Sequence, residues 1–419
     1  MQRLYVYACF DWLPSPLPMG VLGYESLRGT DSYSFCYADD WLRRYGALFI
    51  SADIRNYPGM QYTLPGRDIF GCFADALPDR WGRLLVSRRE QILAAEQQRP
   101  LRRLTSFDYL TGIDDYSRMG ALRFKTSPDG DYINVDDRLR IPPLADIKAL
   151  VAASHEVERC EERNMLPEKR WIQQLVNPGS SLGGARPKAS VLDAEGRLCV
   201  AKFPSRNDDY DVALWEHLCH LLADKAGIDA AVTSVVSAGD RYHVLLSRRF
   251  DRTDDGRRHH FASAMTLLGL SDGCNAATGN GYVDIVDFIV QHCCDVECNL
   301  HQLYRRVAFN IAVGNSDDHF RNHGFLLTPR GWTLSPAYDI NPTHRASQSL
   351  LINRNTAAAD LQLLLESSDD YMIPRNEATA IIRDVSQAVA TWQTVARHLN
   401  VAPREADYFR EIFTRQPCI

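Results

Sequence analysis

Hydrophobic and polar positions change their spacing several times along the chain, and each change predicts a different secondary structure. Residues 4–10 (LYVYACF) and 46–51 (GALFIS) hold the β-branched and aromatic side chains that are typical of strands. Residues 76–98 repeat their apolar positions at helical spacing, and residues 119–124 (MGALRF) return to a strand pattern. The pattern therefore predicts a mixed, strand-rich region over the first ~120 residues.

The rest of the chain moves from alternating elements to helices. Residues 144–176 have helical spacing. Residues 177–250 alternate short strands with one amphipathic helix, 212–228, whose end is marked by Gly227, and residues 189–203 predict a hairpin that turns at Glu195-Gly196. From residue 255 onward the pattern is mostly helical. It is interrupted at 322–342 by two apolar runs on either side of a Pro-Arg-Gly turn, which predicts a hairpin.

Composition and charge narrow the class of protein. The chain has 419 residues, of which 45% are hydrophobic and 24% charged, and its net charge is −6. This balance is typical of a folded protein with two or three domains. The acidic charge argues against a broad nucleic-acid-binding face. No apolar run approaches the ~18 residues of a membrane helix, and Asp11 interrupts the apolar N-terminus, so we expect no secretory signal and a cytoplasmic location.

The eleven cysteines are an odd number spread along a long chain, which does not suit a secreted disulfide framework. Four residues do cluster: His292, Cys293, Cys294 and Cys298. Structural zinc sites usually combine two separated pairs of ligands, whereas this cluster is a single stretch inside an apolar helical pattern. We therefore interpret these cysteines as small hydrophobic residues, and a metal-binding role stays open.

The strongest indication of chemistry is a group of two carboxylate side chains and one amide side chain around the predicted hairpin. Asp317 is followed five residues later by Asn322, and the hairpin leads to Asp339. Phosphoryl transfer needs such a set, because one carboxylate orients the attacking hydroxyl while an amide and a second carboxylate hold Mg²⁺. Protein kinases use the same Asp-to-Asn spacing, although Asp318 and His319 replace the usual companions and no Asp-Phe-Gly is present. The simpler interpretation is that these polar residues only build loops.

Other parts of a kinase occur upstream in the expected order. Lys202 ends a predicted strand with apolar neighbours, where an ammonium group needs a partner. Glu216 follows in the amphipathic helix, at a distance that lets strand lysine and helix glutamate meet. The glycines Gly183 and Gly184 precede a strand and make a loop that could approach phosphate, but they match no standard phosphate-binding pattern. Each feature alone is more often a surface residue or a turn.

Taken together, these segments resemble the HipA-type serine/threonine kinases, the toxins of HipBA-like toxin–antitoxin modules. The resemblance extends over nearly the whole chain. It is carried most specifically by GNSDDHFRNHGFLL (314–327) and by LSPAYDINP (334–342). Supporting segments lie upstream and are FADALPDRWGRLL (73–85), MGALRF (119–124), SLGGARPKASV (181–191), VAKFP (200–204) and LLSRRFDR (245–252).

The resemblance implies a role for each matching residue. Asp317 would be the catalytic aspartate with Asn322 beside it, and Asn322 and Asp339 would bind Mg²⁺. The residues that would hold ATP are Lys202, Glu216, Gly183, Gly184, Ala185, Arg249, Phe250 and His319. Among them, Lys202 would be the ATP lysine and Glu216 its partner. Ser181, with Ser180 adjacent, would be the autophosphorylation site that ejects the loop and inactivates the enzyme, because a phosphate adds about −1.5 to −2 charge. Pro187 departs from the family pattern and would stiffen this loop.

The fold that we expect is α+β and kinase-like, with two lobes and an added N-terminal subdomain. The subdomain would be residues 1–125, the strand-rich N-lobe with the ATP lysine 145–252, and the mainly helical C-lobe with the catalytic segment 253–419. The nucleotide would lie between the lobes, as small molecules often do at domain interfaces.

The expected function is an Mg-ATP-dependent serine/threonine kinase that inhibits growth by phosphorylating a translation-related protein. The family's targets include aminoacyl-tRNA synthetases, and its antitoxin is a small helix-turn-helix protein, so we expect both kinds of partner, with no direct contact to nucleic acid and none to membrane. Two alternatives remain. One is a non-catalytic, kinase-fold interaction protein that acts through an antitoxin bound to DNA, and the other is a small-molecule kinase of related fold.

Overall fold

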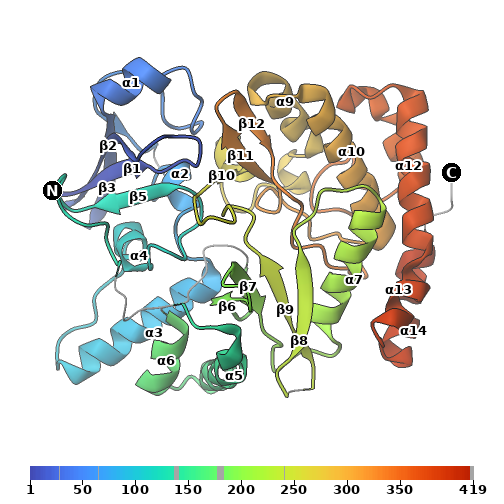
Figure 1. Ribbon diagram of the computed structural model, residues 1–419, viewed down its shortest axis with the longest axis horizontal. Coiled ribbons are helices and arrows are strands. Elements are labelled where there is room, and N and C mark those ends of the chain that lie inside the picture. The colour runs from blue at the N-terminus through green and yellow to red at the C-terminus, as the bar shows by residue number, and fades with distance from the viewer. Residues whose placement is uncertain (28, 65, 136–140, 177–183, 240, 416–419) are drawn as a thin grey trace. The chain divides into compact units, whose positions relative to one another are not determined.

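The helices and strands of the computed structural model group into two compact units (Figure 1). The first unit comprises Met1–Asp208 and Ser237–Ala262, and the second comprises Asp209–Val236 and Ser263–Ile419. The structure describes residues 1–27, 29–64, 66–135, 141–176, 184–239 and 241–415. The three-part division expected from the sequence stays a prediction.

The first unit begins with an antiparallel sheet of five strands in the order β4-β3-β2-β1-β5. Alternate residues of the first strand, Leu4, Val6 and Ala8, are fully buried, so one face of this strand supplies core side chains. The central strands approach closely at Gly20, where any Cβ would lie 2.4 Å from the carbonyl oxygen of Cys36. The strands are β1 (Gln2–Ala8), β2 (Leu17–Leu27), β3 (Thr30–Tyr37), β4 (Gln61–Tyr62) and β5 (Leu122–Lys125).

Residues 46–51 do not form the strand that their composition predicts. The preceding helix α1 (Asp39–Tyr45) has two acidic residues in its first turn and two arginines in its last, an arrangement that complements the helix dipole. The backbone N–H of Gly46 then donates to the carbonyl of Leu42 and closes that helix. The chain turns at once, and only an isolated bridge between Ser51 and Ile54 remains.

Helices cover the remainder of the first unit, and the longest is α3 (Arg80–Glu96), which confirms the helical pattern at 76–98. The Arg88 guanidinium donates to both carboxylate oxygens of Glu161 in α5, at 2.5 and 2.6 Å, and so joins these two helices. Helix α6 packs against both α3 and α5 (Figure 1). The other helices are α2 (Gly71–Ala74), α4 (Ser106–Gly112), α5 (Ile147–Glu162), α6 (Lys169–Val176) and a short 3-10 turn, Leu144–Asp146.

A second antiparallel arrangement in the first unit contains β6 (Lys188–Leu192), β7 (Leu198–Lys202) and β9 (His243–Arg248). The predicted hairpin between β6 and β7 is confirmed, with Gly196 at its turn in the left-handed region, φ 78°. That conformation strains any residue with a Cβ, which explains the glycine. In the register of this hairpin, Lys188 lies opposite Lys202.

The second unit is mainly helical and is organised around the buried helix α10 (Val296–Val313), which contacts α9, α11, α12 and α14 (Figure 1). Helix α7 (Val212–Lys225) begins with an Asp211 cap, and the glycine predicted to mark its end, Gly227, follows it at φ 73°. The remaining helices are α8 (Ala264–Leu267), α9 (Tyr282–His292), α11 (Leu361–Glu366), α12 (Arg375–Ala390), α13 (Trp392–His398) and α14 (Pro403–Thr414), with 3-10 turns at Ala276–Thr278 and Ser368–Tyr371.

Strands are few in the second unit. The predicted hairpin around Pro-Arg-Gly is confirmed as β11 (Gly324–Thr328) and β12 (Gly331–Leu334), paired from Phe325 with Leu334 to Thr328 with Gly331. Strands β8 (Thr233–Ser237) and β10 (His260–Ser263) each end at a boundary of the two units. Among the helices of the described residues, none is long and apolar enough to cross a membrane.

Candidate functional site

The loop after α10 carries the residues with the strongest chemical signal. Helix α10 ends at Gly314, which has φ 68° and donates its backbone N–H to Ile311. The loop then runs through Asp317 and reaches β11 at Gly324. The Asp317 side chain is 68% exposed, and its carboxylate lies 3.6 Å from the equally exposed guanidinium of Arg345. This acid is therefore open to a reacting group, and the ion pair that it makes among the described residues is with a solvated side chain.

The next residue, Asp318, points the other way and anchors the loop in the second unit. Its Oδ2 accepts hydrogen bonds from the Tyr282 hydroxyl at 2.6 Å, from Asn310 Nδ2 at 2.8 Å and from His323 Nε2 at 2.8 Å. Burial alone would raise the pKa of Asp318, but the neighbouring His323 and these donors outweigh burial and lower it. The buried carboxylate is thus held ionised by partners from two helices and the loop itself.

Asn322 and Asp339 come together because the β11–β12 hairpin returns the chain to its starting point. Asn322 Nδ2 donates to the Asp339 carboxylate at 3.3 Å, and Asn341 Nδ2 contacts the other oxygen of that carboxylate at 3.3 Å. Asp339 has φ 60°, in the left-handed region that a non-glycine residue rarely occupies. An amide oxygen and a carboxylate are hard oxygen donors, which are the ligands that Mg²⁺ prefers. The pair therefore fits a magnesium ion.

His319 lies between the exposed and the buried parts of this loop. Its carbonyl accepts from the backbone N–H of Asn322 at 2.8 Å, so the loop turns tightly here. The ring atom Nδ1 is buried without a hydrogen-bond partner among the described residues. The second unit thus brings Asp317, His319, Asn322 and Asp339 together in one segment and its hairpin.

The predicted nucleotide residues are divided between the units. Lys202 ends β7 in the first unit, is half-buried, and lies opposite Leu245 of β9. Gly184 has open space where a Cβ would be, and Ala185 follows it in the same bend. Glu216 belongs to α7 of the second unit and is 2% exposed. Gly183, Ser180 and Ser181 lie outside the described residues.

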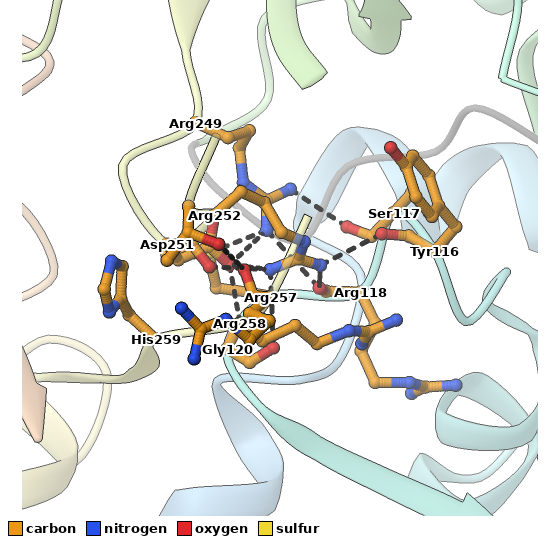
Figure 2. Close-up of polar contacts among 12 residues, drawn as sticks. Tyr116, Ser117, Arg118, Gly120, Arg249, Asp251, Arg252, Arg257, Arg258 and His259 are labelled. Carbon is orange, nitrogen blue, oxygen red and sulfur yellow. Dashed lines mark hydrogen bonds and ion pairs between the residues drawn. The ribbon is translucent and has the colours of Figure 1, made fainter. Parts of the chain in front are cut away.

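Arg249 and Phe250 follow β9, and the Arg249 side chain is committed to a buried network (Figure 2). Its guanidinium donates to both carboxylate oxygens of Asp251 at 2.6 Å and to the Ser117 carbonyl at 2.9 Å. Asp251 also accepts from the backbone N–H of Gly120 at 2.8 Å. Burial would raise the pKa of Asp251, but Arg249 and Arg252 outweigh it and lower the pKa. The network ties the segment after β9 to the segment before β5, within the first unit.

Sequence reasoning missed a buried ion pair beneath the glycine-containing loop. Lys188 Nζ donates to Asp79 Oδ2 at 2.8 Å and to the Gly184 carbonyl at 2.9 Å, and both charged side chains are at most 2% exposed. Asp79 also caps α3 by accepting from the Gly82 N–H. The Lys188 side chain is therefore not an exposed phosphate ligand, because its ammonium group pairs with Asp79 inside the first unit. Asp79 lies in the Leu-Pro-Asp sequence of residues 77–79, and no spacing along the chain connects it to Lys188.

The cysteine cluster shows no metal-binding arrangement. Cys294 Sγ contacts the Trp332 carbonyl at 3.4 Å, and Cys298 is exposed at the start of α10. Across the part of the chain that the structure describes, no group of three or more His, Cys, Asp or Glu side chains is placed to hold a metal ion. The ten cysteines in that part are all free thiols.

Comparison with known proteins assigns the family. The sequence profile of the HipA-like C-terminal domain matches residues 180–392, which is half of the chain, and the chain belongs to this family. The chain is 27% identical over 214 residues to the serine/threonine-protein kinase toxin HipA of Shewanella oneidensis, covering 45% of this chain and 48% of that protein. It is 24% identical over 253 residues to toxin YjjJ of Escherichia coli K12, covering 57% and 52%. These matches span about half the length of each relative.

A solved structure extends the similarity to the whole fold. The chain superposes on HipA in the complex of HipA, HipB and operator DNA from Shewanella oneidensis MR-1 with a TM-score of 0.69, at 18% identity. The match covers 98% of this chain and 95% of that one. The predicted α+β, kinase-like fold of the HipA type is therefore confirmed.

Proposed function

We propose that the protein is an Mg-ATP-dependent serine/threonine kinase that acts as a HipA-type toxin. One observation carries the proposal: Asp317 offers an exposed carboxylate on the same loop whose Asn322 contacts Asp339 at 3.3 Å. A kinase needs one carboxylate that receives the proton of the acceptor hydroxyl, and an amide and a second carboxylate that hold magnesium. These groups must lie close to one another. The naming of relatives as kinase and toxin supports the same class.

In this proposal Asp317 orients the acceptor hydroxyl and receives its proton as the hydroxyl oxygen attacks the terminal phosphorus of ATP. ADP leaves with the electrons of the broken bond. Asp318 does not react, since its carboxylate is buried and occupied by three donors. Its contribution is to hold the loop, and therefore Asp317, at a fixed place, because positioning is a major part of phosphoryl-transfer catalysis.

Asn322 and Asp339 would hold magnesium, which when bound neutralises the charge of the phosphate oxygens. We further propose that the rest of the nucleotide is held by residues given by the family resemblance. Lys202 would contact the phosphates with Glu216 as its partner, and Gly183, Gly184 and Ala185 would form the loop above them. Backbone groups at Arg249 and Phe250 would hold adenine, with His319 near the phosphates.

Regulation and partners form the finer part of the proposal. Ser181 would be phosphorylated by the enzyme itself, which would place negative charge where the ATP phosphates bind. The solved relative assembles with HipB and operator DNA, and we propose that this chain likewise binds a small helix-turn-helix antitoxin. Its substrate would be a translation-related protein.

Incubation with magnesium and γ-labelled ATP tests the activity. Wild-type protein is expected to transfer label to itself or to a lysate protein, and Asp317→Asn is expected to lose the transfer by about a thousandfold or more, the scale on which single catalytic groups act. Asp295→Asn is the matched control, since Asp295 is also exposed and paired with an arginine, Arg330, at 2.8 Å. Failure of wild type and Asp317→Asn alike would leave the non-catalytic interaction protein as the better interpretation.

Two further measurements address the finer claims. Ser181→Ala should abolish autophosphorylation, and label that persists in this variant would move the site to Ser180 or elsewhere. Phosphoproteomics after induced expression, set against Asp317→Asn, identifies the substrate. Co-purification with the product of a neighbouring helix-turn-helix gene tests the antitoxin.

A further inference from the structure

A cavity of about 450 Å³ opens beside Asp317 in the second unit, and the proposed reaction leaves it unused. One wall is the segment 342–345, which follows the Asp339 loop directly. The other walls come from Tyr210, just before α7, and from Tyr408 and Phe409 of α14. Segments from three distant parts of the chain therefore meet at the carboxylate proposed to receive the acceptor's proton.

Four of the eight residues that line this cavity carry aromatic rings, and these rings contact one another. The Tyr210 ring meets the Phe409 ring edge-on, with centroids 4.8 Å apart, and the Tyr408 ring at 6.1 Å. The imidazole of His344 lies 4.3 Å from the Tyr408 ring and stacks on Phe409 at 5.6 Å. We call this set of Tyr210, His344, Tyr408 and Phe409 the aromatic pocket.

The base of the aromatic pocket is buried and closely packed, and its rim is open. Phe409 is 1% exposed and packs on Trp215 with centroids 4.3 Å apart. Trp215 is fixed in turn by donating its indole N–H to Glu405 at 3.0 Å. At the rim, the Tyr408 side chain is 55% exposed and His344 is also exposed. Binding on a preformed base costs little ordering entropy, which favours a pocket over a collapsed patch.

Charge at the rim decides what kind of side chain fits. Asp317 and Arg345, which both line the cavity, lie 3.6 Å apart and largely cancel one another's charge. A charged side chain entering here would meet attraction and repulsion at similar distance and gain little. An aromatic ring would gain edge-on and stacked contacts worth roughly 0.5–1.5 kcal/mol for each ring pair beyond its burial.

We propose that the aromatic pocket binds an aromatic side chain of the substrate protein. This side chain would lie a few residues, along the substrate chain, from the serine or threonine that is phosphorylated. Because Asp317 borders the same cavity, one extended segment, at ~3.3–3.6 Å per residue, reaches both places. The proposal rests on the proposed kinase function. It adds a specificity for the substrate that the catalytic residues do not supply.

A peptide library tests this preference through catalysis. Peptides with one central serine carry Phe, Tyr, Glu, Lys or Ala at each flanking position in turn, and kcat/KM is measured with magnesium and ATP. Wild type is expected to prefer Phe or Tyr over Ala by about tenfold at one position, which is the discrimination that an apolar pocket achieves. Tyr408→Ala is expected to reduce the preference to about twofold, mainly through KM. Tyr57→Ala, an exposed tyrosine of the first unit, should retain the wild-type preference.

A binding measurement keeps the pocket and the kinase activity distinguishable. Fluorescence anisotropy without nucleotide measures the affinity of two labelled serine peptides, one with Phe on both sides of the serine and one with Ala at the same positions. Both peptides are measured on wild type, Tyr408→Ala and Tyr57→Ala. The pocket is supported if wild type and Tyr57→Ala bind the Phe peptide more tightly than the Ala peptide and Tyr408→Ala does not. This result would support the pocket even if no peptide were phosphorylated, in which case only the proposed kinase activity would be wrong. Equal binding of the two peptides overturns the pocket. So does phosphorylation that favours Glu or Lys, or a preference for Phe that Tyr408→Ala retains.

Discussion

His323 donates its Nε2 hydrogen to the buried carboxylate of Asp318 at 2.8 Å, from the far end of the same loop. The lowered pKa of Asp318 means that the carboxylate stays ionised, so it accepts and the imidazole donates. This contact closes the segment from Asp318 to His323, so it helps to fix Asp317, which precedes Asp318, relative to Asn322, which precedes His323. It explains how the exposed Asp317 carboxylate keeps its spacing from the buried Asn322 within one loop.

Tyr282→Phe removes one of the three donors to Asp318 while keeping a fully buried ring in place. We expect a loss of about 1–2 kcal/mol in the free energy of unfolding, because one buried acceptor loses one hydrogen bond. Asp318→Ala should cost more, about 3–5 kcal/mol, because it leaves three buried donors without the charge that they bind. Urea denaturation measures both, and an effect of Asp318→Ala no larger than that of Tyr282→Phe would contradict this account.

The Lys188–Asp79 pair predicts strong coupling inside the first unit. Lys188→Met leaves a buried carboxylate alone and is expected to destabilise the protein by about 3–5 kcal/mol. Asp79→Leu should be at least as costly, since it also removes the cap of α3. The double variant has no isolated charge and should be more stable than the sum of the two losses predicts. Additive losses in a double-mutant cycle would show that the two groups act separately.

His260 predicts a dependence of stability on pH. It is 2% exposed and stacks on Phe10 with centroids 4.9 Å apart, and burial lowers its pKa to about 3. The unfolded chain binds this proton below a pH of roughly 6.5, whereas the folded protein does not until about pH 3. Stability from this group is therefore complete above ~6.5 and falls by about 1.4 kcal/mol per pH unit as the pH drops below that value.

Unfolding by urea at several pH values between about 4.5 and 7 measures this slope. His260→Phe keeps a ring against Phe10 but cannot titrate, so its slope should be smaller than that of wild type. The exposed His398, replaced by Gln, is the control and should leave the slope unchanged. Equal slopes for wild type and His260→Phe would show that His260 does not set this dependence.

The magnesium requirement tests the roles proposed for Asn322 and Asp339. Asp339→Asn retains the shape of the side chain but removes a charge, so the Mg²⁺ concentration for half-maximal phosphorylation should rise by about tenfold or more. Asp295→Asn should leave this concentration unchanged, because the Asp295 carboxylate pairs with Arg330, and its backbone carbonyl, which the substitution keeps, accepts from the Asn299 side chain. An unaltered requirement in Asp339→Asn would place the metal ligands elsewhere.

The sequence predicted well those features that depend on neighbours along the chain. The hairpin turn at Gly196, the end of α7 near Gly227 and the β11–β12 hairpin all follow from local spacing and turn chemistry. The strand predicted at 46–51 failed because composition was weighed without the charge pattern of α1, which ends in a tight turn at Gly46. Local sequence patterns therefore predict that a helix or a hairpin exists more reliably than they predict where it ends.

The contacts that bury Asp79, Lys188 and Asp318 escaped prediction. Asp79 and Lys188 are 109 residues apart, and no period in the sequence connects them. Asp318 was noticed only as a replacement for a usual companion of the catalytic aspartate, because sequence does not show which of two adjacent aspartates turns inward. Only tertiary packing decides that Asp317 faces solvent and Asp318 faces Tyr282 and Asn310.

The way in which the chain alternates between its two units has a consequence for biosynthesis. Helix α7 (Val212–Lys225) lies near the middle of the sequence, yet its Trp215 packs against Trp392 and Phe413, well over 150 residues later. During synthesis the Trp215 side chain stays without these packing partners until well over 150 further residues have been added. In that interval residues 237–262, which complete the other unit, are synthesised. A chain interrupted before α13 would expose the same tryptophan, and would be a natural target for chaperones and proteases.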